Sequence, residues 1–331
     1  MSAGHNRDVA ARPIADPVGE VKLDELARRL RSLTEGDIAV IDAIAIGAPA
    51  IPVLRGLLFE RDPAGIFEPR RRAVHALIVL KATDALKEFV AGWKPAADPV
   101  ERFGDEVVLG AAARALGTTL NDEFYPVLAA VAGKYPVSEV IEALGYFRRS
   151  ESIPILLAAL ADDFSRTAAE QAFRLLGQPA APALMEVASR CGTNFSGRES
   201  QSSIRQRRSA LRLMLELGPT RELWERLSDL VQDSDTEIAV LGCRIGLAAA
   251  GDTAGRDCAC RLVALLPRAR WPLNQEIEDC LRDNLAIASE FVDRALSGWI
   301  DGSTNEIERA RFKRSLRRVK ALGSARLDAE S

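Results

Sequence analysis

The chain has 331 residues, of which 47% are hydrophobic but only 5% aromatic, and its formal net charge is -3 at pH 7. So few aromatic residues in an Ala- and Leu-rich sequence favour close-packed helices over a sheet sandwich, and the slight acidity excludes a global basic field for nucleic acid. No apolar run approaches the roughly 18 residues of a membrane span, and a polar N-terminus with five cysteines lacking framework spacing indicates a cytoplasmic protein with free thiols.

The chain begins with two segments outside the main pattern. Residues 1–19 are polar and contain two prolines, which predicts a disordered tail. Residues 20–35 contain "KLDELARRLRSL", an amphipathic pattern that predicts a capping helix.

A helix-start motif then occurs twice, as "GAPAIPVLRGLL" at 47–58 and "GQPAAPALMEVA" at 177–188. The glycine is expected to end one helix in the left-handed conformation, and the prolines suit the first turn of the next, where a missing N–H costs little. The apolar residues that follow recur at 0, +3 and +4, on one helical face.

This apolar signature recurs eight times in the sequence, 28 to 43 residues apart. Its zero positions are Leu54, Leu86, Leu128, Leu156, Leu184, Leu227, Leu262 and Val292. Another helical pattern precedes each copy, so the repeating unit is a helix–turn–helix. The sequence therefore predicts an all-α fold: an α-solenoid of about eight helix pairs over residues 36–300.

The stretch 137–188 resembles HEAT repeats, in particular the short repeats of phycobilisome lyases. The matching residues are Ala143-Leu144-Gly145, Ile153-Pro154, Leu156, Leu160, Asp162, Ala168-Ala169 and Leu176-Gly177. The resemblance implies a right-handed stack in which the second helices line a concave face. It implies no single activity, because fold and function separate in such repeats.

Two segments interrupt or end the array. The Gly/Ser-rich segment 189–203 is interpreted as a loop that is a tolerated surface insertion, and a functional loop is the alternative. The pattern of residues 301–322 predicts a basic amphipathic capping helix, which begins at the capping box formed by Ser303 and Glu306. Its apolar stripe is Phe312, Leu316 and Val319. We expect the acidic residues of 276–283 to neutralise part of the positive charge of this helix. Residues 323–331 are predicted to be a disordered tail.

The sequence offers little chemistry. His5 lies in the tail, and His75 lies in the apolar run "AVHALIVL", where it is interpreted as a core histidine. Cys258 and Cys260 fall on different faces of a helix, which is poor for joint metal ligation. No phosphate-binding loop or nucleophile elbow is present. We therefore expect no catalytic, cofactor-binding or metal-binding residues and no enzyme activity.

The residues that follow the zero positions predict a partner-binding patch on the concave face. They are Arg55, Lys87, Ala129, Leu157 and Met185. Ala129, Leu157 and Met185 form its apolar centre, which suits an amphipathic helix or an extended segment. The alternative is that these side chains only complete the packing between repeats.

Basic clusters give a second candidate surface, one that binds anions. Its residues are Arg70, Arg71, Arg72, Arg148, Arg149, Arg314, Arg317 and Arg318. Solvated turns are the simpler interpretation, but an aligned arginine edge would follow phosphates in a salt-dependent way.

The sequence thus favours a scaffold or adaptor that binds a protein partner without catalysis and without a cofactor. The alternative is nucleic-acid binding through the arginine edge and the basic C-terminal helix. A chromophore-lyase-like enzyme is a weaker alternative, suggested only by the repeat subtype.

Overall fold

The computed structural model describes residues 17–193, 197–249, 251–297 and 310–321. The predicted tail at 323–331, the capping box at 303–306 and residues 1–16 of the tail predicted at 1–19 lie outside these residues. Residues 17–19 are predicted to be disordered but belong to the first helix, which begins at Pro17. The chain divides into two compact units, and each is described by itself. The N-terminal unit extends to Phe147 and the C-terminal unit begins at Arg148.

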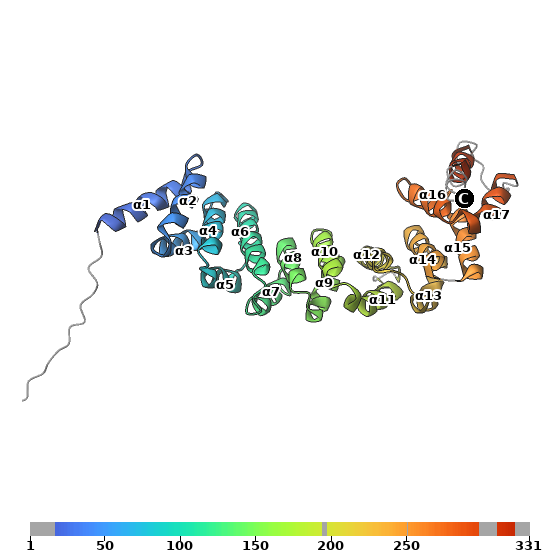
Figure 1. Ribbon diagram of the computed structural model, residues 1–331, viewed down its shortest axis with the longest axis horizontal. Coiled ribbons are helices and arrows are strands. Elements are labelled where there is room, and N and C mark those ends of the chain that lie inside the picture. Colours follow the sequence, from blue (N-terminus) through green and yellow to red (C-terminus); the bar gives the residue numbers. More distant parts are fainter. Residues whose placement is uncertain (1–16, 194–196, 250, 298–309, 322–331) are drawn as a thin grey trace, which may run out of the picture. The chain divides into compact units, whose positions relative to one another are not determined.

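The N-terminal unit is a two-layered stack of helices (Figure 1). Its helices are α1 (Pro17–Arg31), α2 (Gly36–Ile46), α3 (Ile51–Phe59), α4 (Glu68–Val79), α5 (Thr83–Gly92), α6 (Pro99–Thr118), α7 (Tyr125–Ala132) and α8 (Ser138–Tyr146). The first helices of successive pairs, α2, α4, α6 and α8, pack side by side in one layer. The second helices, α3, α5 and α7, form the other layer, and α1 packs against the α2–α4 end.

The C-terminal unit continues the same alternation. Its helices are α9 (Ile153–Leu160), α10 (Arg166–Leu176), α11 (Ala181–Ser189), α12 (Gln201–Leu217), α13 (Arg221–Leu227), α14 (Thr236–Ala249), α15 (Asp252–Leu265), α16 (Leu273–Asp283) and α17 (Leu285–Ser297), followed by the helical residues 310–321. The first helices α10, α12, α14 and α16 are neighbours in one layer. The predicted all-α fold of stacked helix pairs is confirmed.

The predicted apolar signature is the core of both units. Every zero position is at most 1% exposed: Leu54, Leu86, Leu128, Leu156, Leu184, Leu227, Leu262 and Val292. Most of the +3 and +4 residues are buried with them. A helix pair cannot bury this stripe alone, so stacking the next pair on it supplies the stabilisation.

The duplicated helix-start motif forms the same turn in both units. Gly47 and Gly177 end α2 and α10 with φ values of 77° and 69°, and their backbone N–H groups donate to Ala43 and Phe173. Their ψ values of -138° and -142° correct the prediction of a left-handed helical conformation. Both glycines lie in the mirror image of the extended region, which a Cβ atom disfavours. The short 3₁₀ helices η1 (Ala48–Ala50) and η3 (Gln178–Ala180) then lead into the second helices.

Helix 310–321 covers the end of the C-terminal unit. Phe312, Leu316 and Val319 are 4%, 0% and 2% exposed and join the core formed by α14–α17. Arg318 donates to Glu278 at 2.9 Å, so part of the expected neutralisation is present. No helix within the described residues is long and apolar enough to cross a membrane.

Candidate functional site

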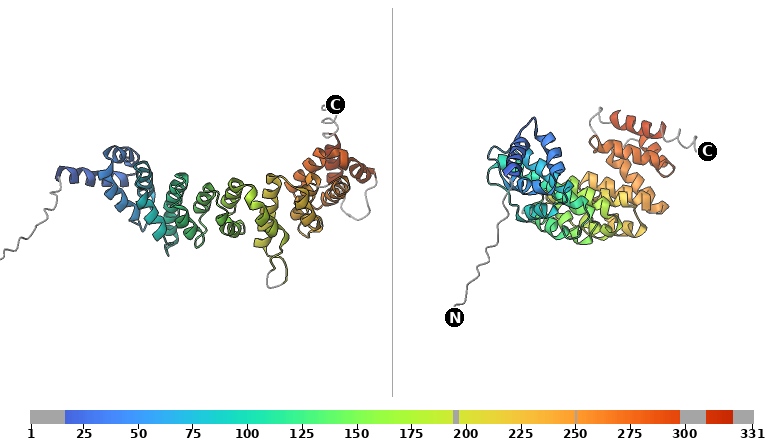
Figure 2. Two further views of the ribbon diagram at one scale, coloured as in Figure 1. Left: turned by 60° about the horizontal axis from the view of Figure 1, so that its bottom comes forward. Right: turned by 60° about the vertical axis from the view of Figure 1, so that its left-hand side comes forward.

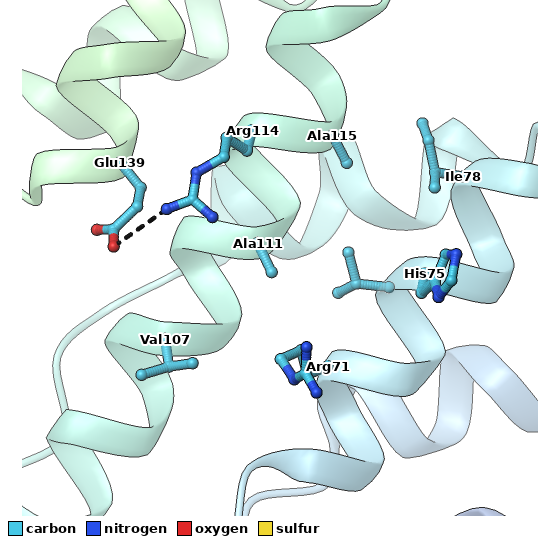
Figure 3. A pocket seen from close by; sticks show the side chains of 9 residues that line it. Arg71, His75, Ile78, Val107, Ala111, Arg114, Ala115 and Glu139 are labelled. Atoms are coloured by element: carbon cyan, nitrogen blue, oxygen red, sulfur yellow. Dashed lines mark ion pairs between the residues drawn. The ribbon is translucent and has the colours of Figure 1, made fainter. Parts of the chain in front are cut away.

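A groove of about 370 Å³ lies on the first-helix layer of the N-terminal unit (Figure 3). It is bounded by α4 and α6, with α8 at one side. Its lining residues are Arg71, Val74, His75, Ile78, Val107, Ala111, Arg114, Ala115 and Glu139.

The floor of this groove is aliphatic. On α6, Val107, Ala111 and Ala115 follow one another at four-residue spacing, which places them on one helical face. On α4, Val74 and Ile78 repeat the spacing. The two alanines are small, so α4 and α6 leave a hollow between them that larger side chains would fill.

The rim of the groove is charged but weakly paired. The Arg71 and Arg114 side chains are about half exposed, at 52% and 50%. Arg71 pairs with Glu68 of its own helix at 2.8 Å. Arg114 lies 3.4 Å from Glu139 and 3.5 Å from Glu142, beyond good hydrogen-bond length. Exposed ion pairs of this kind contribute about 0–1 kcal/mol to stability. A ligand carboxylate could therefore take the place of Glu68 on Arg71, or of Glu139 on Arg114, at small cost.

His75 is on the groove and not in the core, which corrects the sequence interpretation. Val74 and Ala76, its neighbours along α4, are buried, whereas His75 is exposed. The near-continuous apolar run conceals this, because adjacent residues of a helix lie about 100° apart and one of them can face solvent. In Figure 3 its imidazole lies on the same helix as Arg71, across from Ala111 and Ala115 of α6.

The predicted concave residues of the N-terminal unit are ion-paired or partly covered. In the N-terminal unit, Arg55 pairs with Glu88 at 2.6 Å, Lys87 lies 3.8 Å from Glu123, and Ala129 is half-buried.

In the C-terminal unit, Leu157 and Met185 are likewise half-buried. The Leu157 carbonyl accepts from Gln206 Nε2 at 2.5 Å. Met185 faces a cavity of about 190 Å³ that it shares with Met214 and Leu223. Leu157 and Met185 are thus only partly covered, and the predicted partner-binding patch stays a prediction.

The three consecutive arginines of α4 have different environments. Arg70 is 5% exposed; its Nε donates to the Leu58 carbonyl at 3.0 Å and its Nη1 donates to Asp105. Arg72 is 7% exposed and pairs with Asp37 at 2.9 Å. The solvated cluster expected from the sequence is therefore wrong for Arg70 and Arg72, because Asp105 binds Arg70 and the Leu30 and Ser32 carbonyls with Asp37 bind Arg72. Arg71 remains on the surface.

The other predicted anion-binding arginines belong to the C-terminal unit. Arg148 is exposed in the turn before η2 (Ser150–Ser152), and Arg149 is half-buried. Arg314, Arg317 and Arg318 are exposed on helix 310–321, far along the chain from the first two.

The C-terminal unit has a second groove, of about 340 Å³, that sequence reasoning missed. Successive first helices each place an arginine there, but each is neutralised. Arg174 binds Glu216 at 2.6 Å, and Arg212 and Arg244 both bind Glu276, at 3.2 and 3.0 Å. The Arg174 hydrogen bond lowers the pKa of Glu216 below its usual range. This groove is a saturated ion-pair ladder, which suits stacking of the helices more than ligand capture.

Metal-binding clusters are absent from the described residues: no group of three His, Cys, Asp or Glu side chains there is arranged to hold an ion. Cys258 is buried and Cys260 exposed, as the helix geometry predicts.

No protein-family model and no curated protein matches the chain. Among solved structures, a chain of the complex of CpcE and CpcF of phycocyanin lyase from Nostoc sp. PCC7120 aligns at 18% identity, over 88% of this chain and 100% of that chain, with a TM-score of 0.32. Human deoxyhypusine hydroxylase aligns at 20% identity, over 85% of this chain and 96% of that chain, with a TM-score of 0.30. Both are HEAT-repeat proteins. The chain is similar to them in being an all-helical repeat protein.

Proposed function

We propose that the protein is a non-catalytic scaffold that holds a segment of a protein partner in the groove between α4 and α6. The observation that carries the proposal is the combination of an aliphatic floor with Arg71, His75 and Arg114 at the rim. A groove of this composition suits a segment that presents an apolar side chain flanked by carboxylates.

The energetics favour such a segment. Burying one leucine-sized side chain on Val107, Ala111 and Ala115 contributes about 1.5–3 kcal/mol. Carboxylates of the partner replace the long contacts of Arg114 with Glu139 and Glu142 by short, charge-assisted hydrogen bonds.

The proposal puts the binding surface on the first helices, whereas the sequence predicts it on the second helices. The second-helix side chains Arg55 and Lys87 already face carboxylates of the next pair, and Ala129 is half-buried. The proposal keeps the scaffold hypothesis but moves the binding surface to the groove between α4 and α6.

The test is a pair of matched substitutions in the N-terminal unit. Ala111→Glu fills the groove and opposes a carboxylate ligand, whereas Ala130→Glu makes the same change on the exposed side of α7. The proteins that co-purify with each tagged variant from its own cells are quantified after nuclease treatment at moderate salt. We expect one partner to be lost with A111E and retained with A130E, both variants being equally helical by circular dichroism.

A partner retained by A111E would show that this groove is not the binding surface. Arg71→Glu combined with Arg114→Glu should weaken the same partner, and the reverse charge on the partner should restore it. A purified protein that absorbs visible light through a bound pigment would instead support the chromophore-lyase-like alternative.

A further inference from the structure

Helix 310–321 brings a second surface together at the end of the C-terminal unit. It lies along α16, with Ser315 Oγ 3.5 Å from Asn274 Oδ1 and Arg318 2.9 Å from Glu278. Residue numbers rise together in the two contacts, so both helices run in the same direction. Figure 2 shows the red helix beside the orange ones. The first described turn of helix 310–321, which carries Arg311, therefore lies at the same end of the pair as the N-terminus of α16, which residues 268–272 precede.

This surface is basic and carries an exposed aromatic ring. Trp271 is 79% exposed. Arg268, Arg270, Arg311 and Arg314 are also exposed, and within the described part of the chain none of these four forms an ion pair. The sequence has no acidic residue between Asp257 and Glu276. By contrast, Arg318 and Lys320 on the same helix are paired with Glu278 and Asp293.

We propose that this surface, formed by Arg268, Arg270, Trp271, Arg311 and Arg314, binds single-stranded nucleic acid. Exposed arginines neutralise successive phosphates, and a solvent-facing indole ring stacks on a base whatever its sequence. Leaving so large a ring in water is unfavourable by itself, and a stacked base relieves that cost. The site is separate from the α4–α6 groove and does not rest on the scaffold function.

The same geometry disfavours a membrane surface. An amphipathic helix binds a bilayer through its apolar face. In helix 310–321 that face, Phe312, Leu316 and Val319, is already buried in the core of the unit. An acidic peptide could pair with the arginines, but it would leave the Trp271 ring without a stacking partner.

The experiment uses the full-length protein and fluorescein-labelled 20-nucleotide oligo(dT) and oligo(U), with binding followed by anisotropy. Trp271→Ala should weaken binding about tenfold, since stacking contributes about 1–3 kcal/mol per base. Arg311→Glu with Arg314→Glu should weaken it more strongly and reduce the dependence of log K on log salt.

Matched controls come from the same unit. The Phe164 side chain is 88% exposed, so Phe164→Ala removes an exposed aromatic ring outside the proposed surface. Arg190→Glu with Arg221→Glu makes the same change of charge at side chains 76% and 82% exposed. Both controls should bind as the unmodified protein does.

Several outcomes would overturn the proposal. Equal binding by W271A and the unmodified protein would remove the stacking site. Equal competition by polyglutamate and unlabelled oligo(dT) would indicate an acidic protein ligand. Sedimentation with vesicles containing 30% phosphatidylserine, combined with no anisotropy change, would indicate a membrane surface.

Discussion

Arg70 and Arg207 occupy corresponding positions in the two units. Each donates its Nε–H to a carbonyl in the last turn of the preceding second helix, Leu58 for Arg70 and Ala188 for Arg207, and both distances are 3.0 Å. Each also pairs with an aspartate of the following repeat, Asp105 or Asp233. One guanidinium thus satisfies an orphan helix carbonyl and links the preceding second helix, its own helix and a carboxylate further along the chain.

Replacing Arg207 should destabilise the C-terminal unit. Its side chain is 1% exposed, and it holds Glu199 at 2.8 Å and Asp233 at 2.6 Å, whose side chains are 14% and 10% exposed. Arg207→Ala leaves two desolvated carboxylates without a counter-ion, which should cost about 3–5 kcal/mol in the free energy of unfolding. Urea denaturation followed by circular dichroism measures this. The control Arg221→Ala, at an 82% exposed side chain, should change the free energy by less than about 1 kcal/mol. Similar losses for both variants would contradict the assigned role.

The C-terminal helix should contribute to stability through its apolar stripe. Leu316 is 0% exposed, so Leu316→Ala should cost about 2–5 kcal/mol through lost burial and the cavity left behind. Removing residues 303–331 should likewise lower the melting temperature. Arg317→Ala, on the exposed side of the same helix, is the control and should leave it nearly unchanged. Unchanged melting of L316A and of the truncated chain would show that the helix does not cap the unit.

The core was predictable because its signal is local. Eight apolar positions, from Leu54 to Val292, follow from helical spacing alone, and all of them are buried. The surfaces were not predictable in this way, because they depend on which helix packs beside which. Arg70 and Arg72 are buried where groups from neighbouring pairs bind them: Asp105 binds Arg70, and Asp37 with the Leu30 and Ser32 carbonyls binds Arg72. The Trp271 surface did leave a signal, namely an 18-residue stretch with arginines and no carboxylate, from Cys258 to Gln275.

The cysteines should react in an order set by burial. Cys191 and Cys260 are exposed, whereas Cys243 and Cys258 are buried and burial raises the pKa of Cys280 to about 11. Iodoacetamide at pH 8 should therefore alkylate Cys260 first. Cys191 should follow more slowly, because partial desolvation raises its pKa and only the thiolate reacts. Peptide mass spectrometry of a time course measures the order, and early modification of Cys243 or Cys258 in the folded protein would contradict the packing of α14 on α15.

Asp235 should make the stability of the C-terminal unit depend on pH. Burial alone would raise its pKa, but the hydrogen bonds from Arg208, at 2.6 and 3.0 Å, and from the Ile238 backbone N–H hold it below its usual value. A carboxylate with a lowered folded-state pKa stabilises the fold above its unfolded pKa of about 3.9, and this contribution disappears as the pH falls through the folded value.

Asp235→Asn keeps a side chain that can cap α14 but removes the charge. The urea midpoint of D235N should therefore lie below that of the unmodified protein at pH 6, and the difference should shrink steadily below about pH 4. Asp229→Asn, at an exposed carboxylate of η4 (Ser228–Gln232), is the control and should shift the midpoint little at either pH. A difference for D235N that stays constant from pH 6 to pH 2 would show that Asp235 acts through its shape and not through its charge.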